Sequence, residues 1–159
     1  MAVSYRKMSY LPLAGSRGMG DPLDMKTIPK NEVLRVPAAS PQDALEHFES
    51  FFAYETDCWD VHAAQQLESP GFVILDVRSK DLFDAGHVPG AVHLPHWQIN
   101  EQRMADWDAS TLFVVYCAGP HCNGAKRGAI RLAGLGRPVK EMVGGIEGWK
   151  DEGFDLESA

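Results

Sequence analysis

The sequence predicts one three-layer α/β domain whose central, mostly parallel sheet is flanked by helices, and two observations carry that prediction. Short continuous apolar runs, of which GFVILDV and TLFVVY are the clearest, are typical of strands buried on both faces. Segments with helical spacing alternate with these runs, as the crossover connections of a parallel sheet require. The chain has 159 residues, which suits a single domain that folds around its own core.

The first 36 residues are expected to form an irregular arm, so the domain is assigned to residues 37–159. Proline and glycine interrupt the arm repeatedly, and its apolar residues follow no sustained period. The first helix is expected over 41–52, where apolar side chains recur at helical spacing. Ser40 can cap this helix, and Pro41 suits its first position.

The remaining elements follow from local patterns along the chain. A helix is expected over 60–69, where Val61, Ala64 and Leu67 lie along one face. Continuous apolar or β-branched runs predict strands at 71–77, 91–94, 111–116 and 139–143. Further helices are expected between and after these strands, at 79–86, 98–107, 123–136 and 146–153. Because helix and strand alternate throughout, the sheet is expected to be parallel.

The composition is that of an ordinary globular protein with an excess of acidic residues. Lys and Arg number 15 and Asp and Glu number 22, which gives a formal net charge of -7. Proteins that grip phosphate backbones usually carry a basic face, so a nucleic-acid partner is not expected. No apolar run approaches the ~20 residues that cross a bilayer, and the N-terminus lacks the apolar core of a signal peptide. We therefore expect a cytoplasmic protein without a membrane partner.

Cys117 stands where the second buried strand ends and a glycine-containing loop leads into a helix. Ligands of parallel sheets bind beyond the carboxyl ends of the strands. The free N–H groups and the dipole of a helix start favour negative charge, and Lys126 and Arg127 lie in the first turns of this helix. Such surroundings lower the pKa of a thiol. Cys117 is therefore favoured as a nucleophile over the other interpretation, a buried structural cysteine.

Three motifs around this loop resemble the rhodanese-like sulfurtransferases. They are LDVRSKDLFDAGHVPGAVHLP, VVYC with its loop and helix, and VKEMVGGIEGW, which occur in the order of the family within residues 56–154. The resemblance implies a rhodanese-like domain in which Cys117 takes a sulfane sulfur from a donor such as thiosulfate. Cys117 would hold this sulfur as a persulfide and pass it to cyanide or a thiol, and the acceptor could be a small molecule or a protein.

The chemistry expected from the residues agrees with this resemblance. A low-pKa thiolate can split sulfur transfer into two displacements, and this needs neither a metal nor an organic cofactor. Inward-pointing N–H groups of the loop can bind the terminal sulfur, and a protonated His121 could steer an anionic donor. The residues expected to bind the substrate are Ala118, Gly119, His121, Cys122, Asn123, Gly124, Lys126 and Arg127.

The loop departs from the pattern of many family members, which leaves the donor preference open. Cys122 stands where those members carry a basic residue, and the helix begins about two residues later, as in a long-loop variant of the family. A related class of phosphatases needs arginine at the sixth place after its cysteine. Here Asn123 and Gly128 occupy the sixth places after Cys117 and Cys122, so phosphatase activity is not expected. The alternative function is a non-catalytic interaction or regulatory module that acts through a partner.

Two interpretations of Cys122 are open. A loop curled around an anion site could bring its two thiols near the ~7 Å Cα separation that a disulfide allows. Cys122 could then resolve the Cys117 persulfide, as paired thiols do in redox proteins. The same curl could instead turn Cys122 away from Cys117. We favour this second interpretation, in which Cys122 is dispensable for catalysis.

Other residues in the motifs are assigned structural roles. Asp76 and Arg78 could be catalytic, but structural roles are favoured. Asp76 is expected to accept hydrogen bonds from loop N–H groups and Arg78 to pair with an acid, because buried charges persist mainly when paired. Gly144 and Gly145 are expected to form a tight turn near the active loop, and Trp149 is expected to lie in the core.

A metal site is not expected, although the chain contains several histidines and cysteines. His87 belongs to the GHVPG turn, and Pro95 separates His93 from His96 and so prevents helical spacing between them. A site would need three or four convergent ligands. Cys58 is expected to be a packing residue at the edge of the fold.

Overall fold

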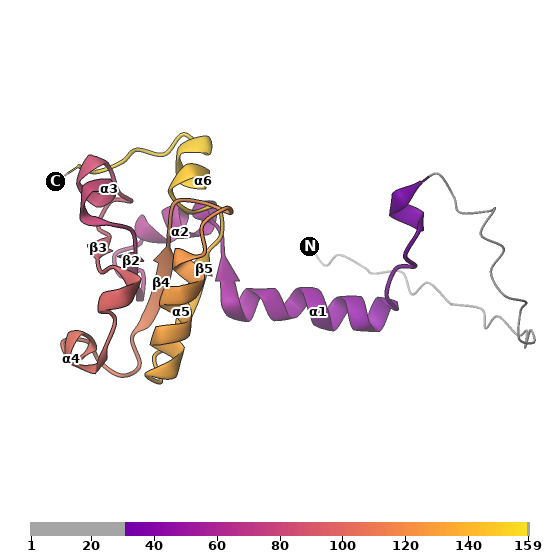
Figure 1. The fold of residues 1–159 in the computed structure, drawn as a ribbon, viewed down its shortest axis with the longest axis horizontal. Coiled ribbons are helices and arrows are strands. Elements are labelled where there is room, and N and C mark those ends of the chain that lie inside the picture. The colour runs from indigo at the N-terminus through magenta and orange to yellow at the C-terminus, as the bar shows by residue number, and fades with distance from the viewer. Residues whose placement is uncertain (1–30, 159) are drawn as a thin grey trace, which may run out of the picture. The chain divides into compact units, whose positions relative to one another are not determined.

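The computed structural model describes residues 31–158, which fall into two units that divide between Ala39 and Ser40 (Figure 1). In the first unit, the described residues contain a short 3-10 helix, η2, at Glu32–Leu34. Residues 1–30 of the predicted arm lie outside the described residues. The arm and its boundary with the domain therefore stay predictions.

The second unit alternates helices and strands, as the sequence predicts. Its strands are β1 (Glu55–Thr56), β2 (Phe72–Asp76), β3 (Val92–His93), β4 (Leu112–Tyr116) and β5 (Val139–Met142). Its helices are α1 (Pro41–Tyr54), α2 (Cys58–Gln65), α3 (Lys80–Ala85), α4 (Glu101–Met104), α5 (Gly124–Gly134) and α6 (Gly145–Asp151), with a 3-10 helix, η3, at His96–Gln98.

The strands form one sheet in the order β1-β5-β4-β2-β3, and every neighbouring pair in it is parallel. β4 lies at the centre, where Val114 pairs with Ile74 of β2 and with Lys140 of β5. The prediction of a parallel sheet is therefore confirmed. Parallel neighbours can be joined only by crossover connections, so the helices must lie over the faces of the sheet.

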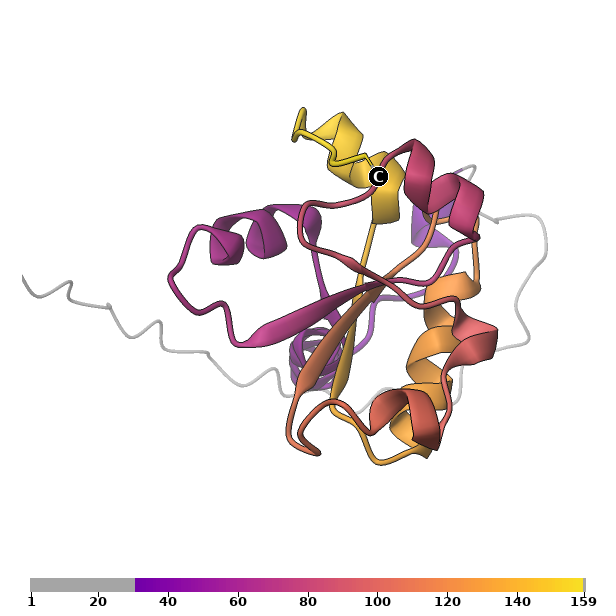
Figure 2. The ribbon, with the colours of Figure 1, turned by 90° about the vertical axis from the view of Figure 1, so that its left-hand side faces the viewer.

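Alternate side chains of the central strands fill two separate layers of the core. On one face, Ile74 and Tyr116 pack in a cluster with Trp149 of α6, which is fully buried as predicted. On the other face, Leu75 and Val115 pack in a cluster that includes residues of α4 and α5. Figure 2 shows α5 (orange) and α2 (purple) on opposite sides of the strands. The domain thus has the three-layer α/β fold that the sequence predicts.

The second helix differs from its predicted bounds. α2 begins at Cys58 because the Asp57 carboxylate accepts a hydrogen bond from the Asp60 N–H at 2.8 Å and so caps the helix. The helix ends at Gln65, and Leu67 lies beyond it as an exposed side chain. The prediction that the helix reaches residue 69 and carries Leu67 on the same face as Val61 and Ala64 is therefore wrong.

The helix predicted over 98–107 is also shorter in the structure. Asn100 caps α4 by accepting a hydrogen bond from the Arg103 N–H at 3.0 Å, so the residues before it form η3 instead. The two-residue strand β1 was not predicted at all. It follows α1 directly and pairs with β5 at the edge of the sheet.

The helix predicted over 41–52 is present as α1, and its apolar stripe is exposed. The Ser40 hydroxyl accepts a hydrogen bond from the Asp43 N–H at 3.1 Å, as expected of a cap. No residue of α1 is buried, and Phe48 and Phe52 are exposed.

None of the helices within residues 31–158 combines the length and the apolar character needed to cross a bilayer.

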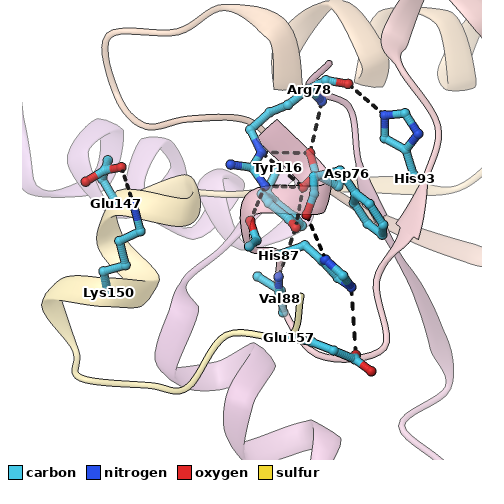
Figure 3. Close-up of polar contacts among 11 residues, drawn as sticks. Asp76, Arg78, His87, Val88, His93, Tyr116, Glu147, Lys150 and Glu157 are labelled. Carbon is cyan, nitrogen blue, oxygen red and sulfur yellow. Dashed lines mark hydrogen bonds and ion pairs between the residues drawn. The ribbon is translucent and has the colours of Figure 1, made fainter. Parts of the chain in front are cut away.

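A buried polar network joins β2, β4 and the turn after α3 (Figure 3). The Asp76 carboxylate is 0% exposed and accepts hydrogen bonds from Arg78 Nε at 2.9 Å and from the Tyr116 hydroxyl at 2.7 Å. The Tyr116 oxygen accepts a bond from the Val88 N–H at 3.0 Å, and the Arg78 guanidinium also donates to the Gly86 carbonyl at 2.7 Å. The network ties the DVR motif to the GHVPG turn. The structural roles predicted for Asp76 and Arg78 are therefore confirmed.

The protonation states of this network follow from its burial. Burial raises the pKa of Tyr116, and the Asp76 charge raises it further, so the hydroxyl stays protonated and donates. Burial alone would lower the pKa of Arg78, but the hydrogen bond and charge of Asp76 outweigh this and the pKa is raised. Removal of either charge would leave the other one buried without its partner.

Candidate active site

Cys117 directly follows β4 at the carboxyl edge of the sheet. Its side chain is only 6% exposed and belongs to the same apolar cluster as Ala125 and Leu132 of α5. α5 has 11 residues and begins at Gly124, a few residues after Cys117. The predicted arrangement of strand end, loop and helix start is confirmed. This is the edge of a parallel sheet at which ligands bind.

Main-chain hydrogen bonds hold the loop after Cys117. Within the loop, the Cys122 N–H donates to the Gly119 carbonyl at 2.9 Å. At its start, the Cys117 carbonyl accepts from the Ile146 N–H at 3.0 Å. The first turn of α6 therefore anchors the strand end that carries the sulfur.

The glycine pair before α6 lies against this strand end. Gly144 and Gly145 have φ angles of 93° and 59°, which side chains rarely allow, so they form the tight turn that was predicted. A Cβ at Gly145 would lie 2.5 Å from the Cys117 carbonyl oxygen and 3.0 Å from the Gly119 nitrogen. The sequence pattern did not reveal this close approach, which leaves no room for a side chain.

A disulfide joins Cys117 to Cys122, whose Cα atoms lie 6.4 Å apart. Gly124 leaves space for the two sulfur atoms, because a Cβ there would lie 2.6 Å from the Sγ of Cys117 and 3.4 Å from that of Cys122. The expectation that the loop turns Cys122 away from Cys117 is wrong. The curl of the loop brings the two Cα atoms within the range that a disulfide spans.

A hollow of about 150 Å³ opens beside Cys117, between the loop, the start of α5 and the ends of β1 and β5. Of the residues predicted to bind the substrate, Gly119 and Lys126 line this hollow together with Cys117. The predicted residues that do not line it are Ala118, His121, Cys122, Asn123, Gly124 and Arg127. Two carboxylates that were not among the predicted site residues, Glu55 and Glu141, line it as well.

The charges at the hollow are partly paired. Lys126 Nζ lies 2.8 Å from a carboxylate oxygen of Glu141. This hydrogen bond raises the pKa of Lys126, and the charges of Glu141 and Glu55 act in the same direction. Glu141 could have been found from the sequence, because it lies near the carboxyl end of a predicted strand. Glu55 could not, because β1 was not predicted.

The other charged or polar residues of the loop region lie elsewhere. The side chains of His121 and Asn123 are exposed. Arg127 acts on His96: burial lowers the pKa of His96, and the charges of Arg127 and Arg131 lower it further. Lys126 is therefore the cation that lines the hollow.

Cys58 is the third thiol and lies beneath the glycine turn. It is 4% exposed, and its Sγ lies 3.5 Å from the carbonyl oxygens of both Val143 and Gly145. Burial, and then the charges of Asp57 and Glu152, raise the pKa of Cys58 to about 11. Its predicted packing role is confirmed, although it lies in the core rather than at the edge of the fold.

Iodoacetamide is expected to leave Cys58 unmodified in the folded, reduced protein at pH 8. With a pKa of about 11, only about one Cys58 side chain in a thousand would be a thiolate, and the thiolate is the reactive form. Peptide mapping after alkylation measures this, with a urea-unfolded sample as the control in which Cys58 must react. Rapid labelling of Cys58 in the folded protein would contradict its burial.

The histidines of the GHVPG region serve packing and hydrogen bonding. The His87 ring stacks on Phe83, and its Nδ1 lies 2.9 Å from the Phe83 carbonyl oxygen. His93 Nε2 lies 3.1 Å from the Arg78 carbonyl oxygen. Within residues 31–158, no three His, Cys, Asp or Glu side chains converge to hold a metal ion.

Comparison with known proteins places these features in a family. The model of the rhodanese-like domain matches residues 61–152. The thiosulfate sulfurtransferase GlpE of Pseudomonas entomophila is 37% identical over 89 residues, which cover 55% of this chain and 78% of the relative. An HTH-type transcriptional regulator of Mycobacterium tuberculosis is 31% identical over 94 residues, which cover 58% of this chain but only 41% of the regulator.

Solved structures agree with the sequence comparison. A crystal structure of a Bacillus halodurans protein, 34% identical, covers 75% of this chain and 87% of its own with a TM-score of 0.72. The rhodanese-like domain of an Anabaena protein, solved by NMR and 25% identical, covers 66% of this chain and 79% of its own with a TM-score of 0.58. The matched residues include strands β2 to β5, the glycine turn and the strand end with Cys117, and on this evidence the chain belongs to the rhodanese-like domain family.

Proposed function

We propose that the protein is a sulfurtransferase that moves a sulfane sulfur through a persulfide on Cys117. The donor would be a compound such as thiosulfate, and the acceptor cyanide or a thiol. The observation that carries the proposal is the position of Cys117 at the end of β4, beside the hollow and at the start of α5. Similarity to proteins named thiosulfate sulfurtransferase supports the proposal.

In the first half-reaction, the Cys117 thiolate would attack the sulfane sulfur of thiosulfate. A new S–S bond forms, the bond to the sulfonate sulfur breaks, and sulfite leaves with the electron pair. The dipole at the start of α5 favours the negative charge of the thiolate and of the persulfide. In the second half-reaction, cyanide or a thiolate attacks the outer sulfur and restores the Cys117 thiolate.

The disulfide with Cys122 must be reduced before this cycle can begin, because a disulfide-bonded Cys117 has no thiolate to attack the donor. The test is therefore made on reduced, desalted protein kept without oxygen. Thiosulfate should add the mass of one sulfur atom or release sulfite, and peptide mapping should place the reaction at Cys117. Reduced protein that releases no sulfite and gains no sulfur would overturn the proposal.

The similarity to the transcriptional regulator favours a second candidate, a regulatory module that acts through a partner. The exposed apolar residues of α1 offer such a partner a surface. Sulfite release separates the two candidates. A regulatory module without transferase activity would leave thiosulfate intact even when Cys117 is reduced.

Glu141→Gln is expected to raise kcat/KM for thiosulfate about two- to fivefold, since an ion pair whose lysine is exposed to solvent is worth up to roughly 1 kcal/mol. The substitution removes the carboxylate that pairs with Lys126 at the hollow, so the lysine can attract the dianionic donor. The increase should shrink at high salt, which screens exposed charges.

A matched control keeps the same kind of charge change away from the hollow. Asp84→Asn removes the carboxylate that pairs with Lys80 on α3 at 2.6 Å, and it should leave kcat/KM as in the wild type. Steady-state assays at two salt concentrations make the comparison. An unchanged or lower kcat/KM in Glu141→Gln would contradict the assigned role of Lys126.

A further inference from the structure

We infer that Cys122 is a resolving thiol, which breaks down the Cys117 persulfide and releases its outer sulfur as hydrosulfide. The inference rests on the proposed function, because it needs a persulfide on Cys117. It adds a second activity to that function, the reduction of sulfane sulfur at the expense of an external dithiol. Four features of the loop support it.

The first feature is that the structure already contains the bond that this reaction would form. The Sγ atoms of Cys117 and Cys122 are joined, and their Cα atoms lie 6.4 Å apart. The Cys122 N–H keeps its hydrogen bond to the Gly119 carbonyl in this state, and the Cys117 carbonyl keeps its bond to the Ile146 N–H. The loop therefore accommodates the product of the reaction with its main-chain bonds in place.

The second feature is that donor and resolving thiol reach the Cys117 sulfur from different sides. Cys117 lines the hollow, whereas Cys122 does not. The outer sulfur of the persulfide can occupy the hollow, and Cys122 approaches from the side of Gly124, where the missing Cβ leaves room for both sulfur atoms. Displacement at sulfur needs the attacking and leaving atoms on opposite sides, and this arrangement provides that.

The third feature is a hydrogen bond that favours the Cys122 thiolate. The Gly124 N–H lies 3.4 Å from the Sγ of Cys122 and donates to it. Asn123 occupies the cap position of α5, but its side chain makes no capping hydrogen bond. The Cys122 sulfur therefore accepts one of the free N–H groups at this helix start. Such a donor stabilises a thiolate and increases the fraction that can attack.

The fourth feature is the difference in exposure of the two sulfurs. Cys117 is 6% exposed and belongs to the core, whereas Cys122 is half-buried. A thiol reductant of any size can reach Cys122 more easily than Cys117. The reductant would attack the Cys122 sulfur, and Cys117 would leave as the thiolate that the next cycle needs.

The Cys122 thiolate attacks the inner sulfur of the persulfide, which is the Sγ of Cys117. The bond between that Sγ and the outer sulfur breaks, and the outer sulfur leaves with the electron pair and takes a proton from water, so that it is released as hydrosulfide. The sulfane sulfur is reduced and the two cysteines are oxidised to a disulfide. An external dithiol then restores both thiols by thiol–disulfide exchange and becomes a disulfide itself.

A single-turnover experiment tests the inference. Reduced wild-type protein, freed of thiols and kept without oxygen, is mixed with thiosulfate, and sulfite, sulfide and protein mass are measured. The wild type should release sulfite and sulfide in similar amounts and should yield a peptide crosslinked between Cys117 and Cys122. Dithiothreitol, added after the donor is removed, should restore both thiols.

Cys122→Ser should release sulfite but about tenfold less sulfide, and should accumulate a persulfide on Cys117, because no internal thiol displaces the outer sulfur. Cys122→Ala serves as a second variant with the same expected result. Cys58→Ser is the matched control, since it removes a thiol that lies outside the loop, and it should release sulfide like the wild type. Wild-type protein without thiosulfate should stay reduced.

The outcomes separate the inference from the function on which it rests. Sulfite without sulfide from the wild type, with a persulfide as stable as that of Cys122→Ser, would overturn the resolving role and leave the transferase function intact. Absence of both sulfite and sulfur gain would overturn the transferase function and the inference together. Loss of sulfide release in Cys58→Ser would show that Cys58, and not Cys122, is the resolving thiol, and would overturn the inference.

Discussion

Cys117→Ser is expected to lower sulfite release from thiosulfate by at least about 10³-fold, as loss of a nucleophile does in covalent catalysis. A serine hydroxyl is not ionised at neutral pH and cannot form a persulfide, so both half-reactions are lost. The domain should still fold, because the hydroxyl is similar in shape to the thiol and the side chain belongs to a cluster that other residues complete. The cost of burying a hydroxyl without a full set of partners is about 1–3 kcal/mol.

Sulfite release and intact mass measure the activity, and circular dichroism with thermal unfolding measures the fold. Cys58→Ser serves as the control for loss of a buried thiol, and it should load sulfur like the wild type. Sulfur loading of Cys117→Ser at the wild-type level would contradict the proposal, because it would show that another cysteine is the nucleophile. Peptide mapping would then show which of the two remaining thiols carries the sulfur.

The fold could be predicted because its central strands are apolar on both faces. β2 and β4 carry one set of side chains toward α2 and α6 and the other toward α4 and α5, so no polar alternation interrupts them. β1 escaped prediction for the opposite reason. It consists of Glu55 and Thr56, and only its pairing with β5 makes it a strand. Such a short element is defined by its neighbour, not by its own residues.

The site could be predicted in part. The position of Cys117 between a strand end and a helix start could be predicted because strand end, loop and helix start are all local features of the sequence. The pair of Lys126 and Glu141 was missed because it joins α5 to β5 across 15 residues. The orientation of Cys122 was predicted wrongly, since the loop curl alone allows both directions. The space at Gly124 and the N–H that it donates to the Cys122 sulfur decide the direction, and both depend on the packed structure.

Asp76→Asn is expected to destabilise the domain by about 3–5 kcal/mol, the usual cost of breaking a buried ion pair. The substitution keeps the size of the side chain but removes its charge, so the Arg78 guanidinium would remain buried without a counterion. The new amide N–H₂ group would also face donors, because both Arg78 and the Tyr116 hydroxyl donate to the carboxylate. Tyr116 cannot relieve this by ionising, since burial raises its pKa.

Asp84→Asn is the matched control, because it makes the same change in an exposed ion pair, where Lys80 lies at 2.6 Å. Its expected cost is below about 0.5 kcal/mol. Urea unfolding measures both variants, and the midpoint of Asp76→Asn should fall without a change in slope, with a Tm lower by on the order of 10 °C. The folded fraction of Asp76→Asn at low temperature should still load sulfur, since the network holds the DVR motif and the GHVPG turn and does not line the hollow. Loss of sulfur loading in protein that is still folded would instead place Asp76 in the catalytic machinery. A loss of unfolding free energy as small as that of Asp84→Asn would show that the buried pair of Asp76 and Arg78 adds little to the stability of the fold.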